Sequence, residues 1–235
     1  MTLRFEPVSE THCIVYLSEV IDPSLAVSIA ALAKALQAAL PSALVEVVPS
    51  YTSLLLEFHP LRISRKQLER AVLEQHALLQ SGQASGHAQQ QTLTLPVYYH
   101  SEVGPDLDDL AASSGLAKEQ VVEIHSQQVY TVCAIGFAPG FAFLASVDAR
   151  IAAPRRATPR LQLPAGSVGI AERQTAVYPQ QSPGGWQIIG NCPLALFDPK
   201  HSPTSPFEVG MQVRFEPVSR EQFIELGGQI CQDWK

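Results

Sequence analysis

The sequence predicts an α+β protein, in which a small N-terminal α+β domain is followed by a β-barrel domain. Three observations support this fold class. Roughly the first 80 residues alternate short β-rich runs with two amphipathic stretches, in the order β-β-α-β-β-α. The run 81–91 is polar and lacks apolar periodicity, so the two domains are expected at 1–85 and 92–235. From 129 onward, short apolar runs stand between Gly and Pro turns, a pattern typical of a small barrel.

The N-terminal domain is expected to begin with two short strands, at 3–6 and 12–17, the second of which is rich in β-forming residues. Asp22 is predicted to cap the helix that follows, with Pro23 in its first turn, and Pro41 to end it. The apolar face of this helix is formed by residues at spacings of four, three, four and four positions: Leu25, Ile29, Leu32, Leu36 and Leu40.

Two more strands and a second helix complete this domain. The strands are expected at 43–48 and 52–58, with a turn between them. Ser64 and Gln67 have the spacing of a capping box, in which each side chain bonds the backbone N–H of the other residue. They therefore predict a helix that begins after Ser64 and ends near Leu79.

The second domain is expected to contain two short helices among its strands. Gly104-Pro105-Asp106 starts the first helix, which Gly115 stops. The second helix runs from about Lys118 to Ser126. The clearest strands are 92–98, 129–135 and 211–216.

Composition and charge exclude several classes of protein. Of the 235 residues, 46% are hydrophobic and 16% charged, which is enough apolar material for a sizeable core. The net charge of −6 argues against wholesale binding to nucleic acid or to an anionic membrane. The four cysteines form no C-x-x-C pair, so free thiols in a cytoplasmic protein are expected. Neither a signal peptide nor an apolar run of about 20 residues, as a membrane span requires, is predicted.

The segment Gly136–Gly190 carries most of the functional information. Its Gly and Pro residues stand between aromatic and branched apolar side chains, which indicates ordered turns around a concave surface. The segment holds five arginines against two acidic residues, a local excess suited to a carboxylate or a phosphate. The residues expected to wall a substrate site are Phe137, Pro139, Gly140, Phe141, Gly166, Ser167, Tyr178, Ser182, Gly184 and Trp186.

Several common motifs are absent from the sequence. There is no G-x-x-x-x-G-K-[ST] phosphate loop, no H-E-x-x-H and no clustered Cys/His pattern, so no metal site is predicted. The run Gly166-Ser167-Val168-Gly169 lacks the G-x-S-x-G spacing of a nucleophile elbow. Gly136 and Gly140 do not complete a dinucleotide fingerprint.

Four residues are candidates for chemistry, each with a structural alternative. His125, at the end of a helix, suits a general acid/base or phosphate donor, or else a capping or half-buried histidine. Arg155 and Arg160 each follow a proline and suit an anion-binding fork, or else solvated loops. Gln174 suits the orientation of an amide or lactam, because Gln has no special role in turns.

Together these motifs resemble the family of B subunits of ATP-hydrolysing 5-oxoprolinases. That family is also described as allophanate hydrolase subunit 1 and as the sporulation kinase A inhibitor family. The resemblance is dense from Pro96 to Phe197 and extends less specifically over the N-terminal third. Its most specific parts are Gly136–Leu144, Pro164–Ala171 and Ser182–Trp186, with Gly104–Leu107, His125, Tyr130, Gln174-Thr175 and Tyr178-Pro179.

The resemblance implies a cyclophilin-like β-barrel after the N-terminal α+β domain. It also implies one component of a cytoplasmic hetero-oligomer, which acts directly with a C subunit built of related barrels and with a separate A subunit. The pair of B and C subunits is similar to the carboxyltransferase part of biotin-dependent urea carboxylase. ATP is then a co-substrate, bound together with the partner. Biotin is not implied, because no part of the chain is similar to a biotin attachment site.

The chain departs from the family pattern at three places. Tyr99-His100-Ser101 stands where the family has Tyr-Gly-Gly. Glu172 and Ala176 replace two glycines around Gln-Thr, which would strain Ala176 if its φ were positive. Asn191 replaces an arginine, and this loss weakens an anion site.

The activity implied by the resemblance is the opening of 5-oxo-L-proline to L-glutamate with hydrolysis of ATP. Arg155 and Arg160 are then expected to act as anion donors, His125 as acid/base or phosphate donor, and Gln174 as the orienting group. An alternative from the same family is a regulatory protein that inhibits a sensor histidine kinase, and no residue of the chain separates the two. Prolyl isomerisation follows only from the barrel and is disfavoured, because a fold does not fix a function.

Overall fold

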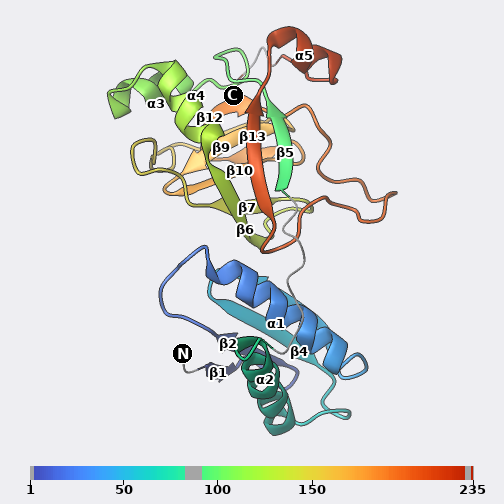
Figure 1. The fold of residues 1–235 in the computed structure, drawn as a ribbon. Helices are drawn as coiled ribbons and strands as arrows, with labels where there is room; N and C mark the ends of the chain where they lie inside the picture. Colours follow the sequence, from blue (N-terminus) through green and yellow to red (C-terminus); the bar gives the residue numbers. More distant parts are fainter. Residues whose placement is uncertain (1–2, 83–91, 231–233, 235) are drawn as a thin grey trace. The chain divides into compact units, whose positions relative to one another are not determined.

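The computed structural model describes residues 3–82, 92–230 and 234. The chain divides into two compact units, Met1–Gln90 and Gln91–Lys235 (Figure 1). Each unit has its own hydrophobic core, so each is stabilised by contacts within itself.

The first unit is a four-stranded antiparallel sheet with two helices on one face (Figure 1). The strand order is β1-β2-β4-β3, and the order of elements along the chain confirms the predicted β-β-α-β-β-α pattern. Alternate strand residues, such as Cys13, Val15, Leu54 and Leu56, face the helices and are buried. The elements are β1 (Arg4–Pro7), β2 (His12–Tyr16), α1 (Leu25–Ala39), β3 (Leu44–Ser50), β4 (Ser53–Phe58) and α2 (Arg65–Gln80).

Both helices of the first unit follow from local sequence signals, with one correction. The predicted apolar face of α1 is confirmed, because Ile29, Leu32 and Leu36 are fully buried. The predicted N-cap at Asp22 is wrong: the helix begins after Ser24, and the Asp22 side chain accepts a bond from the Ser24 N–H at 2.9 Å. A short polar side chain that bonds the backbone two residues on forms a turn of its own, and this turn delays the helix.

The predicted capping box of α2 is confirmed. The Ser64 N–H donates to Gln67 Oε1 at 2.9 Å, and the Gln67 N–H donates to Ser64 Oγ at 3.4 Å. These two bonds satisfy backbone groups that a helix N-terminus otherwise leaves without partners. The start of α2 is therefore fixed by residues that are neighbours in sequence.

In its described residues, the second unit is a nearly closed, barrel-like sheet of seven strands with three helices and a separate two-stranded sheet. The order of the large sheet is β12-β9-β10-β7-β6-β13-β5. Its two edges meet where Tyr98 and Asn191 exchange two backbone hydrogen bonds, of 2.9 and 3.0 Å. This closure confirms the predicted fold class. The large sheet consists of β5 (Thr92–Val97), β6 (Val129–Ile135), β7 (Ala142–Ala145), β9 (Ser167–Ala171), β10 (Gln174–Val177), β12 (Gln187–Asn191) and β13 (Gln212–Pro217).

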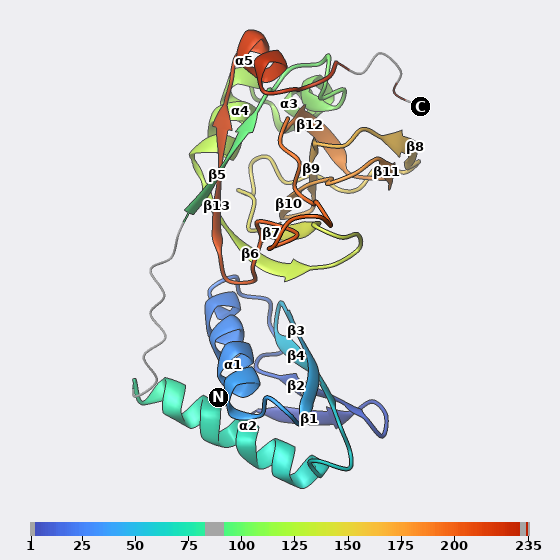
Figure 2. The same ribbon diagram turned by 90° about the vertical axis from the view of Figure 1, so that its right-hand side faces the viewer.

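The helices and the small sheet occupy different sides of this unit. Figure 2 shows β8 (Arg160–Leu163) and β11 (Ser182–Gly184) on the side away from β5 and β13. The helices are α3 (Leu107–Ser114), α4 (Lys118–Gln127) and α5 (Arg220–Glu225). Helix α3 ends at Gly115, with φ of 66°, as the sequence predicts. Neither α5 nor the small sheet was expected from the sequence.

Strand alternation gives β10 two different surroundings, and this division positions the candidate site. Thr175 and Val177 face the main core, against which Leu110 of α3 and Val121 of α4 pack. Ala176 and Tyr178 face the opposite way, into a second cluster rich in aromatic rings. Residues that are adjacent in sequence therefore belong to separate environments.

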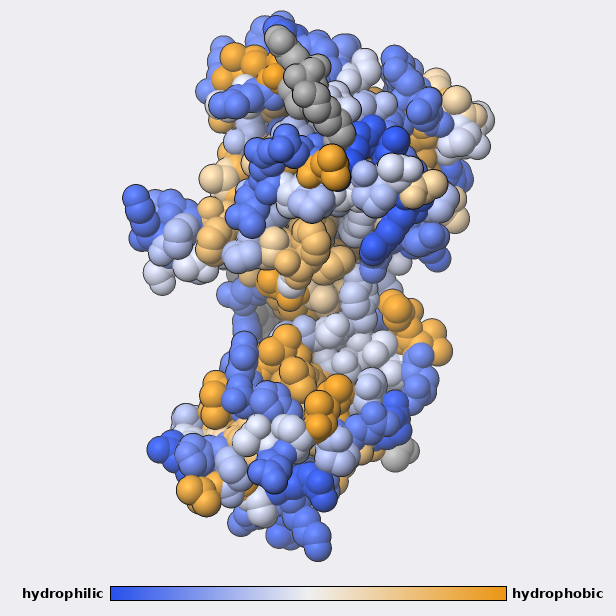
Figure 3. Space-filling view, turned by 180° about the vertical axis from the view of Figure 1, so that it is seen from behind, coloured by the Kyte–Doolittle hydropathy of each residue, from blue (hydrophilic) through white to orange (hydrophobic). Residues whose placement is uncertain are grey.

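Hydrophobic side chains also reach the surface of each unit. Figure 3 shows them on one face as separate patches among hydrophilic residues. In the second unit, Leu161 is 77% exposed and Phe137 67% exposed. Phe137 lies beside other aromatic rings, so it can contribute to a larger aromatic surface.

Three other expectations concern the whole chain. Cys13, Cys133 and Cys192 are buried and form no disulfide among the described residues, and Cys231 lies outside those residues. In the part of the chain that the structure describes, no helix is long and apolar enough to cross a membrane. Among the same residues, no group of three or more His, Cys, Asp or Glu side chains is arranged to hold a metal ion.

Candidate functional site

Five aromatic rings meet on the side of the sheet that Ala176 and Tyr178 face. Phe141 lies at their centre, with ring centroids 5.1 Å from Phe137, 5.3 Å from Tyr178 and 5.8 Å from Trp186. The fifth ring, Phe143, lies 4.8 Å from Phe141. Edge-to-face contacts of this kind add to the stabilisation that burial provides. We call these five residues the aromatic face. It brings together the four aromatic residues that the sequence placed in the substrate wall.

Phe137 is the exposed member of the aromatic face, and its backbone is strained. Its φ is 71°, although bulky residues rarely adopt positive φ. The loop from Gly136 to Gly140 joins β6 to β7; it includes the exposed Pro139 and ends at Gly140, whose φ is 79°. Strained backbone costs about 1–3 kcal/mol and is concentrated at functional sites. The loop therefore holds an aromatic side chain toward solvent at an energetic cost.

The Tyr178 hydroxyl lies in a tight part of the aromatic face. A Cβ on Gly184 would lie 2.5 Å from this hydroxyl, so the close approach requires glycine. Burial raises the pKa of Tyr178 to about 12, and the nearby Arg155 guanidinium and a backbone hydrogen bond from Trp186 oppose part of that rise. Arg155 itself is exposed. A cationic side chain is therefore available to solvent within electrostatic range of Tyr178.

Gly166 and Ser167 lie in a turn where their polar groups are used internally. Gly166 has φ of 81°, and a Cβ there would lie 2.1 Å from the Cys192 carbonyl oxygen. The buried Ser167 hydroxyl donates to the Pro164 carbonyl at 2.8 Å. These two residues shape the turn: the Ser167 hydroxyl and the Gly166 N–H, which donates to the Tyr178 carbonyl at 2.7 Å, are both used within the protein.

Gln174 and Ser182 differ in the exposure of their polar side-chain groups. Gln174 begins β10 and is partly exposed; strand alternation places it on the same side as Ala176 and Tyr178. The Ser182 hydroxyl is buried and has no hydrogen-bond partner among the described residues. Gln174 therefore lies on the side of the aromatic face, whereas the Ser182 hydroxyl is buried.

Arg160 is bound to an acidic residue that sequence reasoning did not assign to the site. Its Nη1 and Nη2 donate to the two carboxylate oxygens of Asp106 at 2.7 and 2.8 Å. Arg156 Nη1 donates to the same carboxylate at 2.5 Å, and the Ile188 N–H donates to it at 2.7 Å. Asp106 is 1% exposed. Arg160 thus pairs with Arg156 around the buried Asp106 carboxylate, and the structure does not bring it together with Arg155 as a fork.

The buried Asp106 carboxylate joins three distant parts of the barrel. It lies directly before α3, its two arginines lie 50 and 54 positions later, and Ile188 is in β12. Unpaired buried charges are strongly unfavourable, so these four groups stabilise one another. The sequence signal was the run Gly104-Pro105-Asp106, but it indicates only a helix start.

His125 lies on the other side of the sheet from the aromatic face. It is fully buried, and both ring nitrogens have hydroxyl partners: Nδ1 with Tyr99 at 2.7 Å and Nε2 with Thr175 at 2.9 Å. Thr175 donates its own proton to the Gly169 carbonyl at 3.0 Å. Nε2 therefore carries the hydrogen that Thr175 accepts, and Nδ1 accepts from Tyr99.

This environment keeps His125 neutral. Burial lowers its pKa to about 3, and its ring stacks on Phe215 with a centroid distance of 4.6 Å. A proton carrier needs a pKa near the working pH and access to the reacting group. The geometry therefore departs from the predicted acid/base role. It also differs from the predicted alternative of a capping or half-buried histidine, because His125 is fully buried in the core.

The family is decided by a match over most of the chain. The family described as "Carboxyltransferase domain, subdomain C and D" matches residues 3–207. The chain belongs to this family. The resemblance found in the sequence motifs is thereby confirmed.

Relatives of this carboxyltransferase-domain protein carry a common name. It is 49% identical over 129 residues to the B subunit of 5-oxoprolinase from Bacillus subtilis (strain 168), and the match covers 55% of this chain and 54% of that protein. It is 50% identical over 125 residues to the B subunit of 5-oxoprolinase from Escherichia coli O157:H7, covering 53% and 57%. The chain spans about half the length of the curated relatives it matches.

Solved structures share the same fold. TTHA0988 is 35% identical with a TM-score of 0.77, over 88% of this chain and 40% of that one. PH0987 from Pyrococcus horikoshii is 39% identical with a TM-score of 0.56, over 94% and 100%. The Kluyveromyces lactis urea carboxylase, at 17% identity and a TM-score of 0.69 over 95% of this chain and 22% of that one, shares the fold alone.

The departures of this carboxyltransferase-domain protein from the family pattern have unequal consequences. Ala176 lies within β10 and does not have positive φ, so its side chain costs no backbone strain. Glu172 lies in the two-residue turn between β9 and β10 with φ of 51°, which disfavours any residue with a Cβ. Asn191 is buried, and its amide donates to the Ala165 carbonyl at 2.9 Å. It therefore holds the turn beside Gly166 and supplies no cation.

Proposed function

We propose that this chain is the B subunit of an ATP-dependent 5-oxoprolinase, which opens 5-oxo-L-proline to L-glutamate together with its C and A subunits. The observation that carries the proposal is the 44–50% identity to three proteins that are named as B subunits of 5-oxoprolinase. Because the alignments cover about half of each protein, the activity of the whole relative is assigned here only as a proposal.

The proposed reaction requires activation of a poor electrophile. ATP transfers its terminal phosphoryl group to the lactam oxygen, which makes the ring carbon electrophilic. One water adds to that carbon and the C–N bond breaks, which gives an acyl phosphate of glutamate. A second water releases phosphate, so one ATP, one lactam and two waters give glutamate, ADP and phosphate. Negative charge develops on oxygen, and cationic or N–H donors stabilise it.

The aromatic face supplies groups that suit the lactam and its developing charge. The exposed ring of Phe137 offers an apolar wall for a five-membered ring, and the buried Tyr178 ring packs edge-on against it. Gln174 has both an amide donor and an amide acceptor, which match the N–H and the carbonyl of a lactam. Arg155 is an exposed cation in this region, so we assign to it the stabilisation of the negative charge that develops on oxygen. Arg160 and His125 take structural roles in this proposal, because Asp106 and two hydroxyls occupy them.

The nucleotide is proposed to bind together with the partner. The chain has no phosphate loop of the usual sequence, and Arg155 alone does not cradle a triphosphate. The aromatic face then forms one half of a shared site. No biotin is involved in the proposed reaction.

The proposal is tested with the reconstituted enzyme. The chain is mixed with the C and A subunits, and ADP and glutamate are measured with and without 5-oxoproline. Release of both products only in the complete mixture supports the proposed reaction. If the complete mixture releases ADP and glutamate only at the rate seen without 5-oxoproline, the proposed reaction is ruled out.

Arg155→Ala is expected to lower kcat/KM for 5-oxoproline by about 10- to 100-fold, because a charge-assisted hydrogen bond contributes about 1.5–3 kcal/mol. The matched control is Arg150→Ala. Arg150 is also exposed, but its guanidinium already makes two bonds to Asp148, at 3.0 and 2.8 Å. If Arg155→Ala is as active as wild type, Arg155 does not contribute to the substrate site.

Phe137→Gly is expected to raise KM at least about fivefold while it changes the free energy of unfolding by less than about 1 kcal/mol. Glycine relieves the strain at φ of 71° but loses the ring contact with Phe141 and adds chain entropy, so the effects on stability oppose one another. Leu161→Ala is the control, since it also removes an exposed apolar side chain. If Phe137→Gly and Leu161→Ala have the same KM, Phe137 does not take part in substrate binding.

A further inference from the structure

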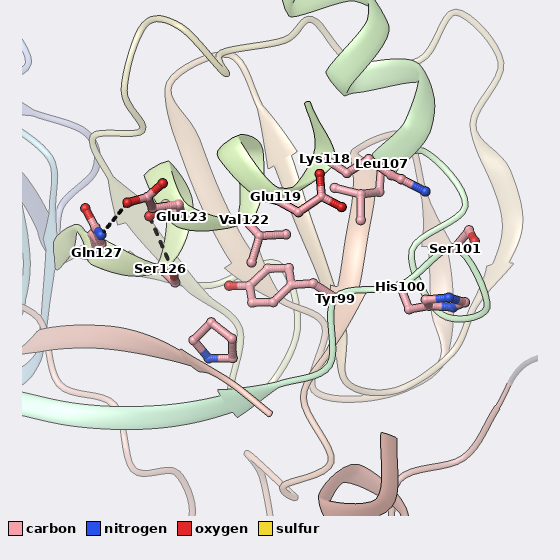
Figure 4. Close-up of a pocket in the computed structure, with 11 residues that line it drawn as sticks. Tyr99, His100, Ser101, Leu107, Lys118, Glu119, Val122, Glu123, Ser126 and Gln127 are labelled. Atoms are coloured by element: carbon pink, nitrogen blue, oxygen red, sulfur yellow. Dashed lines mark hydrogen bonds between the residues drawn. The ribbon is translucent and has the colours of Figure 1, made fainter. Parts of the chain in front are cut away.

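The pocket along α4 uses several of its polar groups within the protein. Its volume is about 490 Å³, and Tyr99 lies at its middle, with its hydroxyl bonded to His125 (Figure 4). Glu123 accepts a bond from the Ser126 hydroxyl at its backbone carbonyl, at 3.4 Å, and one from the Gln127 amide at its carboxylate, at 2.9 Å. The residues that line this pocket are all different from those of the aromatic face, so the pocket is separate from the proposed substrate site.

Trp234 packs against the buried cluster that contains the core of the aromatic face. This cluster includes the rings of Phe141, Tyr178 and Trp186. Trp234 is only partly buried where it packs, and it comes from a part of the sequence far from the other rings. It is therefore a sixth aromatic side chain at the site where the lactam is proposed to bind, and the sequence gave no local signal that would place it there.

Arg160 holds the Trp234 ring in a defined place. The central carbon of its guanidinium lies 5.7 Å from the centroid of the Trp234 ring, within the range of cation–π attraction. The same guanidinium is fixed by two hydrogen bonds to the buried Asp106 carboxylate, at 2.7 and 2.8 Å. A ring that packs on a fixed cation loses less freedom when a ligand binds than a ring that rotates freely. Arg160 is thus a positioning residue, which connects the buried Asp106 cluster to the aromatic face through Trp234.

The Trp234 side chain leaves Phe137 open to solvent. Phe137 is 67% exposed, and its ring contacts Phe141, which belongs to the cluster on which Trp234 packs. The ring of Phe137 is thus accessible to a ligand while Trp234 is in place. Two aromatic side chains from distant parts of the chain, each partly open to solvent, therefore border one buried aromatic cluster.

We propose that Trp234 is a wall of the substrate site, where it contacts the apolar ring atoms of 5-oxoproline and determines how tightly the lactam binds. This inference rests on the proposed function, which supplies the ligand. The lactam ring has methylene groups on one side and polar amide and carboxylate groups on the others, so an aromatic wall and the Gln174 amide suit different parts of it. The indole N–H is a hydrogen-bond donor only, so Trp234 acts in binding and not in proton transfer.

Trp234→Ala is expected to raise KM for 5-oxoproline about three- to tenfold in the mixture with the C and A subunits, while kcat changes less than about twofold, because an interaction used only in binding affects KM. Trp234→Phe keeps an aromatic wall and is expected to stay within about twofold of the wild-type KM. Leu161→Ala is the matched control, since Leu161 is exposed and follows Arg160 in β8. A KM of Trp234→Ala equal to that of wild type overturns the wall. A lower KM shows that Trp234 covers the site and competes with the lactam, and this result also overturns the wall.

Contact between Trp234 and the lactam is measured separately by fluorine NMR. The chain has two tryptophans, so 5-fluorotryptophan incorporated into this chain alone gives two resonances, and Trp234→Phe identifies the one that belongs to Trp234. The labelled chain is mixed with unlabelled C and A subunits, and 5-oxoproline is added. The Trp234 resonance is expected to shift as the lactam binds.

Glutamate release is measured in the same samples, so that the two proposals fail separately. A Trp234 resonance that does not move, in a mixture that forms glutamate from 5-oxoproline, overturns the wall and leaves the reaction supported. A resonance that moves in a mixture without turnover overturns the reaction and leaves the wall supported. Absence of both turnover and a shift overturns both proposals.

Discussion

Asp106→Asn is expected to lower the free energy of unfolding by about 3–5 kcal/mol, the range found when one partner of a buried ion pair is removed. The Asp106 carboxylate accepts four hydrogen bonds, three from arginines and one from the Ile188 N–H. Asparagine keeps the shape but removes the charge, and it turns an N–H₂ group toward donors. Arg160, whose side chain is 11% exposed, is then left almost buried without a counter-charge. Urea denaturation at neutral pH measures the loss.

Asp108→Asn provides a matched control for this prediction. Asp108 lies in the first turn of α3, just after Asp106, and pairs with Lys118 at 2.9 Å, but both side chains are about half exposed. Exposed pairs contribute about 0–1 kcal/mol, so this variant is expected to change stability by less than that. Addition of Arg160→Met to Asp106→Asn is expected to recover part of the loss, because it removes the stranded charge. A loss below about 1 kcal/mol for Asp106→Asn would mean that solvent reaches the cluster.

His125 is expected to make the protein sensitive to acid well above the pH at which it is itself protonated in the folded state. Its pKa is lowered to about 3 by burial, whereas an unfolded histidine titrates near 6.5. Below about pH 6.5 the unfolded state binds a proton that the folded state does not. The contribution to stability is therefore complete above about pH 6.5 and falls by about 1.4 kcal/mol for each pH unit, down to about pH 3.

The measurement compares unfolding free energies at about pH 7.5 and about pH 4.5. The fall between these two values is expected to be about 2–3 kcal/mol smaller in His125→Gln than in wild type, because the variant has no imidazole to protonate. Tyr99→Phe is the control: it removes one hydrogen bond to His125 but leaves the ring buried, so the pH dependence should persist. An equal fall in wild type and His125→Gln would show that the imidazole is not kept neutral by its surroundings.

Local signals in the sequence were sufficient for much of the fold. The spacing of Ile29, Leu32 and Leu36 identified the buried face of α1, and Ser64 with Gln67 identified the start of α2. Such signals act over three or four residues, within one turn of helix. Where two local signals competed, as at Asp22, the prediction was wrong by a few residues because the Asp22 side chain bonds the Ser24 N–H in an Asx turn.

The candidate site was predicted in part. Composition located the aromatic residues of Gly136–Gly190, and the structure brings Phe137, Phe141, Tyr178 and Trp186 into one cluster. The roles of charged and titratable residues were not predictable in the same way. Arg160 has its partner 54 positions earlier in the chain, and His125 has one of its partners 50 positions later.

The sequence by itself determined the fold class, the family and the aromatic composition of the site, because these depend on periodicity, turn residues and motifs that are local. Only the tertiary structure decided which polar groups remain available. Folding of the barrel buries the Asp106 carboxylate where Arg156 and Arg160 pair with it, and it places His125 among Tyr99, Thr175 and Phe215 on the side of β10 away from Tyr178. The free energy of a charge depends on burial and on partners from distant segments, and neither exists before the chain is folded.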